Sequence, residues 1–312
     1  MTDVPVFLIT GFLESGKTTF IKEIFSDSEF SQNEKILIIA CETGVEELPQ
    51  ELLKQNNTSI VSISSKEEFT AEFLKQSSIQ YKPTKVIIEY NGMWPYEIIE
   101  YITLPSKWDI AQVITTIDGS TFEGYMANMK SLLIEQFKDS DLIVFNRCND
   151  NTNKLNFRNS IKAVNTKANL IFELESGEID NRPIELPYDM DADIIEFENY
   201  DYGVWFIDLS ENPKKYEGKK VRVKGMAFNH DRYPKNVFAF GRNAMTCCAD
   251  DIQFLGLLCQ SKEPQNFKGK EWVEIEGILH AQFVPQQQEL VPFMTVTNVK
   301  KIDKLEDELV YF

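Results

Sequence analysis

Apolar residues in the first half of the chain form short continuous runs, and segments with helical spacing separate these runs. Continuous apolar runs are typical of strands covered on both faces, as in a parallel sheet. Their alternation with helices up to about residue 175 predicts a doubly wound α/β domain with a mainly parallel sheet. The predicted strands are Val4–Thr10, Lys35–Ala40, Ser59–Ser64, Thr84–Glu89, Asp109–Ile117, Asp141–Phe145 and Ala168–Phe172. The predicted helices are Thr19–Phe25, Lys66–Gln76 and Phe122–Phe137, with a helix end at Ile161–Lys167.

The pattern changes in the second half of the chain. Residues 181–193 are acidic and contain prolines, and we interpret them as a linker between domains at 1–180 and 194–312. From Ile194 onward, apolar and polar residues alternate with a period of two between glycine and proline breaks. This alternation is typical of half-buried strands and predicts a small antiparallel β-barrel of the OB type. The predicted strands are Val204–Leu209, Lys220–Phe228, Val237–Gly241, Trp272–Leu279 and Phe293–Thr297.

One motif lies between the first predicted strand and the first predicted helix. Residues 11–18 read Gly-Phe-Leu-Glu-Ser-Gly-Lys-Thr, the G-x-x-x-x-G-K-T pattern of a phosphate-binding loop. Backbone N–H groups of such a loop surround a phosphate chain at a helix N-terminus. Lys17 can reach the β- and γ-phosphates, and the Thr18 hydroxyl can bind Mg²⁺. We therefore predict a P-loop NTPase fold with nucleotide contacts from Gly11, Glu14, Ser15, Gly16, Lys17, Thr18 and Thr19.

Acidic residues follow two other predicted strands. Glu42, with Glu46 and Glu47, follows the second strand, and Glu89 ends the fourth. Ligands of a parallel sheet bind at the carboxyl ends of its strands, so these side chains are predicted to lie near the phosphate loop. Glu89 is a candidate for supporting Mg²⁺, and Gly92 lets a backbone N–H approach a γ-phosphate. Glu42 is a candidate for approaching a cation, or else part of a solvated acidic loop.

The segment after the predicted strand Asp141–Phe145 resembles a base-recognition motif only in part. In a GTPase the motif N-K-x-D follows this strand, and its Asp accepts hydrogen bonds from guanine. Asn146 is in place, and Arg147 can supply the aliphatic stem that lies over a base. Asn149 stands where Asp belongs, and an amide offers one acceptor and two donors, which does not match two guanine donors. Asp150 is one residue late, so the choice between GTP and ATP stays open.

Composition narrows the classes of function. With 312 residues, of which 43% are hydrophobic, the chain is long enough for two domains. A net charge of −17 excludes a nucleic-acid binder, because a phosphate backbone would be repelled. No apolar run reaches the roughly 18 residues of a membrane span. Five cysteines, an odd number, and no basic leader before the first strand predict a reduced, cytoplasmic protein.

The first half resembles the CobW-like branch of the P-loop GTPases, relatives of the UreG and HypB metal-insertion GTPases. The resemblance rests on the sequences at residues 10–19, 89–92, 117–118 and 146–147. It implies that Lys17, Thr18, Glu89 and Gly92 bind Mg²⁺ and GTP, and that the loop near Glu42 is a switch. That branch usually carries a C-x-C-C metal motif. The corresponding stretch here is Val-Ser-Ile-Ser-Ser at residues 61–65, so a transferable metal site of that type is absent.

The second half resembles the C-terminal domain of the YcgQ-type proteins, which accompany a predicted permease. The resemblance rests on residues 240–250, which include Cys247, Cys248 and Asp250, and on residues 256–258 and 272–277. Two thiolates and a nearby carboxylate could hold Zn²⁺, which takes sulfur, nitrogen and oxygen ligands. The alternative is a pair of small buried cysteines in a barrel wall.

The leading hypothesis is a Mg²⁺-dependent, slowly hydrolysing GTPase that acts in metal handling or in the control of a partner. The partner would be a metal-dependent protein or a membrane permease component, without insertion of this chain into the membrane. Glu42 and Asp118 are candidates for positioning the attacking water. The alternatives are a P-loop small-molecule kinase or ATPase, and a non-catalytic module that senses nucleotide. The oligomeric state does not follow from the sequence.

Overall fold

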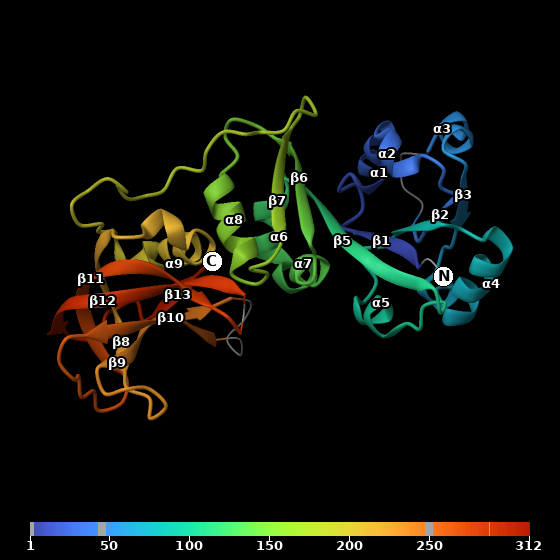
Figure 1. The fold of residues 1–312 in the computed structure, drawn as a ribbon. Helices are drawn as coiled ribbons and strands as arrows, with labels where there is room; N and C mark the ends of the chain where they lie inside the picture. Colours follow the sequence, from blue (N-terminus) through green and yellow to red (C-terminus); the bar gives the residue numbers. More distant parts are fainter. Residues whose placement is uncertain (1–2, 43–47, 247–251, 287) are drawn as a thin grey trace. The chain divides into compact units, whose positions relative to one another are not determined.

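The structure, a computed structural model, describes residues 3–42, 48–246, 252–286 and 288–312. The chain forms two compact units, which can be followed by colour in Figure 1. The first contains Met1–Lys154 and Lys167–Arg182, and the second contains Leu155–Thr166 and Pro183–Phe312. None of the helices in the described ranges combines the length and the apolar character that a membrane crossing requires.

A seven-stranded sheet, counted over the described residues, is the centre of the first unit. Its strand order is β3-β2-β4-β1-β5-β6-β7, and every neighbouring pair is parallel. The predicted parallel sheet is confirmed. The strands are β1 Val4–Thr10, β2 Ile36–Ala40, β3 Thr58–Ser62, β4 Lys85–Glu89, β5 Trp108–Asp118, β6 Leu142–Cys148 and β7 Asn169–Leu174.

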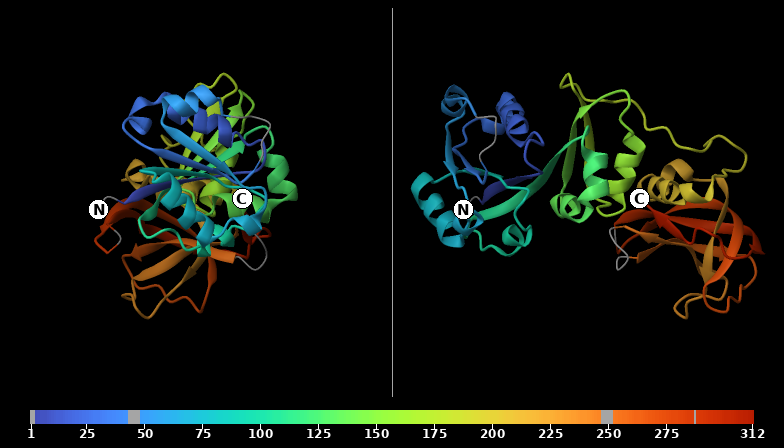
Figure 2. Two further views of the ribbon diagram at one scale, coloured as in Figure 1. Left: turned by 90° about the vertical axis from the view of Figure 1, so that its right-hand side faces the viewer. Right: turned by 180° about the vertical axis from the view of Figure 1, so that it is seen from behind.

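Helices cover both faces of this sheet, as the continuous apolar runs require. Residues of β1, β2 and β4 alternate between two cores. Helices α1, α2 and α3 pack on the core that contains Ile9 and Ile38, and α4 and α5 pack on the core that contains Leu8 and Ile39. Figure 2 shows these two groups on opposite sides of the sheet. The helices are α1 Lys17–Ser26, α2 Ser28–Ser31, α3 Gln50–Gln55, α4 Ala71–Tyr81, α5 Glu97–Tyr101, α6 Phe122–Asn128 and α7 Lys130–Phe137.

Two predicted helices differ in detail from the structure. The segment predicted as one helix over 66–76 contains a short 3₁₀ helix, η1 Lys66–Glu68, before α4 begins. The break arises because Thr70 caps a new helix, its hydroxyl accepting a hydrogen bond from the Phe73 N–H at 3.2 Å. The segment predicted as one helix over 122–137 is likewise divided, into α6 and α7, at Met129. Helix α8, Lys154–Lys162, lies almost entirely in the second unit.

The second unit is built around a six-stranded sheet, counted over the described residues. Its ladders run β10-β12-β11-β8-β9-β13, and β10 also pairs with β9. The pairs β10–β12 and β13–β9 are parallel, so the sheet is mixed, and the predicted antiparallel arrangement is wrong at these two pairs. Strand β10 was not predicted. The strands are β8 Lys220–Phe228, β9 Val237–Met245, β10 Ile252–Ser261, β11 Glu271–Val284, β12 Glu289–Lys301 and β13 Leu309–Tyr311.

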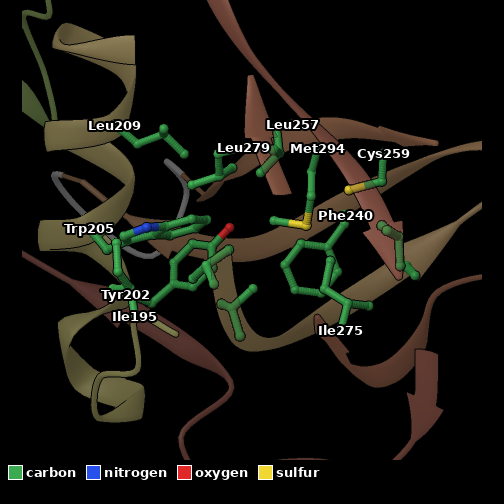
Figure 3. Packing of buried hydrophobic residues seen from close by; sticks show 14 of the residues in the cluster. Ile195, Tyr202, Trp205, Leu209, Phe240, Leu257, Cys259, Ile275, Leu279 and Met294 are labelled. Carbon is green, nitrogen blue, oxygen red and sulfur yellow. The ribbon is translucent and has the colours of Figure 1, made fainter. Parts of the chain in front are cut away.

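The predicted strand Val204–Leu209 is also wrong, because these residues lie in the helix α9, Tyr202–Glu211. Tyr202, Trp205 and Leu209 are separated by three and four positions and are all buried in one cluster, which is the period of a helix face. Figure 3 shows these three side chains pointing from α9 towards the strands that carry Phe240 and Met294. The adjoining helical turns are η2 Asn199–Asp201 and η3 Pro213–Tyr216.

Candidate nucleotide-binding site

The strand order brings several loops of the first unit to one edge of its sheet. Strand β1 lies between β4 and β5, and β4 lies between β1 and β2. Because all these strands are parallel, their carboxyl ends meet at that edge. The loop at 11–18 follows β1, Glu42 follows β2, Gly92 follows β4, and Asp118 ends β5.

The loop after β1 depends on glycine at both ends. Gly11 has φ +129° and Gly16 has φ +97°, values that residues with a side chain rarely adopt. A Cβ at Gly16 would also lie 2.3 Å from Asn146 Nδ2, and a Cβ at Gly11 would lie 2.3 Å from the Thr116 carbonyl oxygen. The loop is therefore packed directly on its neighbours, and α1 begins immediately after it.

Lys17 is buried, with 3% of its surface exposed, and its ammonium group lies back over the loop. Its Nζ donates hydrogen bonds to the carbonyl oxygens of Gly11 and Phe12, both at 2.8 Å. The same Nζ forms an ion pair with Glu42 Oε1 at 2.6 Å. The cation is thus held at the phosphate loop by groups that an anion could replace.

Thr18 and Glu89 are brought together from α1 and β4. The Thr18 hydroxyl donates a hydrogen bond to Glu89 Oε1 at 2.6 Å. Burial raises the pKa of Glu89, while the Thr18 hydroxyl and the charge of Lys17 act in the opposite direction. A hydroxyl and a carboxylate are hard oxygen donors, the kind that Mg²⁺ prefers, so the two residues fit a Mg²⁺ site beside the phosphate loop.

Gly92 lies against the same loop from the side of β4. A Cβ at this position would lie 2.3 Å from the Gly11 carbonyl oxygen and 3.0 Å from the Phe12 Cα. Both neighbours are backbone atoms of the phosphate loop, so a larger residue could enter only if the loop moved. The absence of a side chain at Gly92 is what lets the two loops approach each other.

A buried polar network beneath the phosphate loop was missed at the sequence level. The hydroxyls of Ser15 and Thr116 are 2.8 Å apart, and Gly11 N–H donates to Gln136 Oε1 at 3.4 Å. The hydroxyls of Thr10 and Thr115 are 2.7 Å apart, and both lie within hydrogen-bonding distance of the Gln136 backbone oxygen, at 2.9 and 2.7 Å. The hydroxyl residues within apolar strands could have indicated this network in the sequence, because buried polar groups need hydrogen-bond partners.

The two motif residues Asn146 and Arg147 lie against the phosphate loop. Asn146 Nδ2 donates to the Ser15 carbonyl oxygen at 2.7 Å. Arg147 Nη1 donates to the Glu14 carbonyl oxygen at 2.9 Å and to Asp118 Oδ2 at 2.6 Å. These bonds hold the base motif and the phosphate loop as one body.

Asn149 is engaged in a local turn. Its Oδ1 accepts a hydrogen bond from the Asn151 N–H at 2.9 Å, and its own N–H donates to the Thr152 hydroxyl at 2.9 Å. Asp150, the other candidate at this position, accepts a hydrogen bond from Arg182 Nη1 at 2.5 Å. Both side chains therefore already have partners within the protein.

A cavity of about 220 Å³ lies between the start of α1 and the ends of β6 and β7. Gly16 and Thr19 line one side of it, and Asn146 and Arg147 line another. Three carboxylates that the sequence analysis did not single out also line it, from Glu23, Glu173 and Glu175. Burial raises the pKa of Glu23 and of Glu173, and the charge of Glu23 raises that of Glu173 further. We call this space the base cavity.

Several predicted site residues do not enter this arrangement. Glu46, Glu47, Cys247, Cys248 and Asp250 lie outside the described residues. Within the described residues, no group of three or more His, Cys, Asp and Glu side chains could hold a metal ion. Cys41 is buried next to the site, and burial together with the charges of Glu89 and Glu42 raises the pKa of its thiol, which keeps it protonated.

Comparison with known proteins places the two halves of the chain in different groups. The profile of the CobW/HypB/UreG nucleotide-binding domain matches residues 5–172, and that of the DUF1980 C-terminal domain matches residues 178–312. The curated protein YcgQ of Bacillus subtilis (strain 168), a UPF0703 protein, is 25% identical over 99 residues. That match covers 32% of this chain, and the chain spans only about a third, 35%, of that protein. Both resemblances predicted from the sequence are confirmed.

Two solved structures are among those that resemble the chain. The Zn(II)-bound YjiA GTPase from E. coli has a TM-score of 0.44 and 17% identity, and the match covers 86% of this chain and 92% of that one. The hydrogenase maturation factor HypB from Archaeoglobus fulgidus has a TM-score of 0.41 and 18% identity, covering 55% of this chain and 82% of that one.

Proposed function

This chain belongs to the CobW/HypB/UreG family of nucleotide-binding domains, and we propose that it binds GTP with Mg²⁺ and hydrolyses it slowly. In this proposal it is a switch in metal handling or in the control of a partner protein. One observation carries the proposal: the buried Lys17 ammonium and the Thr18–Glu89 pair converge on a phosphate loop at one sheet edge. That combination supplies a cation, hard oxygen ligands and backbone donors within one loop.

The chain's own groups would act mainly by positioning and by neutralising charge. Lys17 would leave Glu42 and the loop carbonyls and donate to the β- and γ-phosphates. Thr18 and Glu89 would hold Mg²⁺, which when bound neutralises charge on the phosphates. The carboxylate of Glu42, released from Lys17, would then be free to change its position with the bound nucleotide. This exchange is how we expect the loop at Glu42 to respond to nucleotide.

The base cavity supports guanine as the preferred base despite the change at Asn149. Guanine presents two adjacent donors, N1–H and N2–H, and a carboxylate can accept both at once. Glu173 is half-buried at the end of β7 and lines the base cavity together with Asn146 and Arg147. We propose that Glu173 accepts the two guanine donors in place of an Asp at position 149.

The first experiment measures binding of GTP, ATP and XTP to the whole chain, with and without Mg²⁺, followed by phosphate release. We expect GTP to bind more tightly than ATP, with slow release of phosphate that requires Mg²⁺. A Thr18→Val variant should release little phosphate whether or not Mg²⁺ is present, because it lacks the hydroxyl that donates to Glu89. ATP preference would favour the kinase and ATPase alternatives, and binding without phosphate release would favour a nucleotide-sensing module.

A second experiment tests the choice of base. In Glu173→Gln the side chain keeps its size but replaces one acceptor by a donor, which matches the carbonyl that xanthine carries at C2. We expect GTP affinity to fall by about 10-fold or more and XTP affinity to rise, because a bidentate base contact is worth about 1–3 kcal/mol. Glu51→Gln, an exposed residue of α3, is the matched control. Unchanged GTP affinity in Glu173→Gln would contradict this assignment without affecting the phosphate site.

The strand pairing of the second unit supports the proposal of a barrel of the OB type. Its ladders close a ring in the order β8-β9-β10-β12-β11-β8, since β10 pairs with both β9 and β12. We propose that this barrel responds to the nucleotide or contacts the partner. The zinc site at Cys247, Cys248 and Asp250 stays a prediction. It is tested by comparing the zinc content of the purified chain with that of a Cys247→Ser, Cys248→Ser variant.

A further inference from the structure

The second unit contains a cavity of about 490 Å³, and side chains of both charges line it. It lies among β8, β9, β11 and the segment that leads into α9. The charged residues that line it are Arg222, Lys224, Arg242, Glu196, Glu198 and Glu274. We call it the Arg242 cavity, because one of these residues differs from the others in its partners.

Arg242 is buried, with 1% of its surface exposed. Its Nη1 donates to the Asn199 carbonyl oxygen at 2.6 Å, and its Nη2 donates to the Asp307 carbonyl oxygen. Its Nε has no hydrogen-bond partner among the described residues. Burial lowers the pKa of this guanidinium, which reflects the cost of removing a cation from water. A native protein leaves few buried donors unused, so the Nε–H requires an explanation.

The other cations of the cavity already have carboxylate partners. Arg222 pairs with Glu196 and with Glu276, the latter at 2.7 Å. Lys224 lies 4.0 Å from Glu274. Arg242, by contrast, has no carboxylate ion pair among the described residues, because both of its recorded acceptors are neutral carbonyl oxygens.

Aromatic rings fix the orientation of the Arg242 side chain. The guanidinium carbon lies 5.7 Å from the centre of the Tyr202 ring and 5.9 Å from that of the Trp272 ring. Such rings stabilise a cation in part and hold its plane. The position is also unusual for the strand, because β9 buries Phe238, Phe240 and Ala244 at alternate positions, and Arg242 continues that buried series.

We propose that the Arg242 cavity binds a small anion through a carboxylate or phosphate group that accepts a hydrogen bond from Arg242 Nε. Nε–H and the neighbouring Nη2 form the fork with which arginine recognises planar or tetrahedral oxyanions. The anion supplies an acceptor for Arg242 Nε, which the described neighbours of Arg242 do not. The site is separate from the phosphate loop of the first unit and does not depend on the nucleotide proposal.

The competing explanation is structural: Arg242 only ties the backbone at Asn199 and Asp307 to the sheet. The two explanations differ in what they predict for Nε. A purely structural arginine keeps an unchanged Nε–H when anions are added, whereas a binding arginine shows a saturable change. The test therefore follows that proton directly in the unaltered chain, and a variant is used only to assign its resonance.

The probes are inorganic phosphate and acetate, each titrated into isotope-labelled protein while the arginine Nε–H resonances are followed by NMR. Sodium chloride at equal ionic strength is the reference. The Arg242 resonance is assigned by its loss in Arg242→Lys, which keeps the charge and removes the Nε–H. We expect a saturable shift of this resonance with one probe and not with chloride. A response to phosphate alone, or to acetate alone, identifies the class of anion.

Calorimetry with the same probes tests the affinity. A Lys17→Met background removes the contribution of phosphate bound at the phosphate loop. We expect Arg242→Lys to weaken binding by about 10-fold or more, the scale on which a charge-assisted hydrogen bond contributes. Arg232→Lys, an exposed arginine of the same unit, should leave it unchanged. An Arg242 resonance that does not move, or equal affinity in Arg242→Lys, would overturn the proposal.

Discussion

Two buried cations, one in each unit, differ in the groups that surround them. Lys17 has a carboxylate partner, Glu42 Oε1 at 2.6 Å, in addition to two backbone carbonyls. Arg242 has two backbone carbonyls and no carboxylate ion pair among the described residues. A lysine paired with a displaceable carboxylate can exchange that partner for a phosphate group. In our proposal, the arginine instead uses its unpaired Nε–H to bind an anion that enters its cavity.

The comparison also shows how differently the two sites are encoded. Lys17 lies in a contiguous motif, and its principal contacts are with Gly11 and Phe12 of the same loop. Arg242 contacts Asn199 and Asp307, which lie 43 and 65 positions away along the chain. A local motif predicts the first environment, whereas only the folded second unit assembles the other.

Removing the paired cation should have the largest effect. We expect Lys17→Met to lower the rate of phosphate release by about 100- to 1,000-fold, because it removes a preorganised donor to the transferring phosphoryl group. The rate is measured under saturating GTP and Mg²⁺. Lys75→Met, an exposed lysine of α4, is the matched control and should retain the original rate. An active Lys17→Met variant would show that the phosphate loop does not perform the chemistry.

Asp208 is a buried charge of the second unit that has ionic partners, and it can be compared with Arg242. Asp208 accepts hydrogen bonds from Lys215 Nζ at 2.8 Å and from Tyr216 at 2.6 Å, and Arg158 lies 3.1 Å away. We expect Asp208→Asn to lower the free energy of unfolding by about 3 kcal/mol at neutral pH, because the variant loses charge-assisted hydrogen bonds from Lys215 and Tyr216, although Arg158 keeps its ion pair with Glu211. Denaturant unfolding measures the change, and Asp231→Asn, an exposed residue, is the control.

The same variant has a defined pH dependence. Burial acts to raise the pKa of Asp208, but the bonds from Lys215 and Tyr216 outweigh it and hold the pKa below its usual range. The ionised carboxylate therefore stabilises the fold above the ordinary Asp pKa of about 3.9, and this stabilisation is lost as the pH falls through the lower folded value. The difference in unfolding free energy between the original protein and Asp208→Asn should shrink below about pH 4. A constant difference would mean that the charge of Asp208 is not what stabilises the unit.

Substitutions at two glycines test whether nucleotide binding depends on the close packing of the phosphate loop that contains Lys17. A Cβ at Gly92 meets the backbone of the phosphate loop at 2.3 Å, whereas a Cβ at Gly124 in α6 has nothing within 4 Å. We expect Gly92→Ala to weaken nucleotide binding by about 100-fold, the scale of a displacement of about 1 Å in a positioned site. Gly124→Ala should bind nucleotide normally. Equal affinities in the two variants would show that the loop tolerates the displacement.

The smallest expected effect concerns the partner of Lys17. In Glu42→Gln the ammonium loses its carboxylate partner but keeps its two carbonyl acceptors. We expect nucleotide binding without Mg²⁺ to tighten by about 3- to 10-fold, because the charged carboxylate of Glu42 no longer competes with phosphate for Lys17, while the amide that replaces it still offers one acceptor. Fluorescent-nucleotide titration measures the change, with Glu51→Gln as the control. Weaker binding in Glu42→Gln would show that Glu42 assists the phosphate rather than competing with it.

The fold of the first unit was largely predictable, because its strands are continuous apolar runs. The second unit was less so. Val204–Leu209 is rich in β-branched and aromatic residues, which favour strands, yet Tyr202, Trp205 and Leu209 pack into the core of the second unit from one helix face. Packing against the six-stranded sheet, rather than local propensity, decided that element. Strand β10 and the parallel β10–β12 pairing follow likewise from contacts that local patterns do not encode.

The candidate site divides in the same way. The phosphate loop, its helix and the candidates Lys17, Thr18, Glu89 and Gly92 could be predicted from the sequence, because a contiguous motif and strand ends at one sheet edge require only local order. The pairing of Glu42 with Lys17 and the place of Glu173 in the base cavity required the folded protein, as did the burial of Arg242 without a carboxylate ion pair among the described residues. These features depend on desolvation and on partners far apart in the chain, and both exist only after the chain has folded.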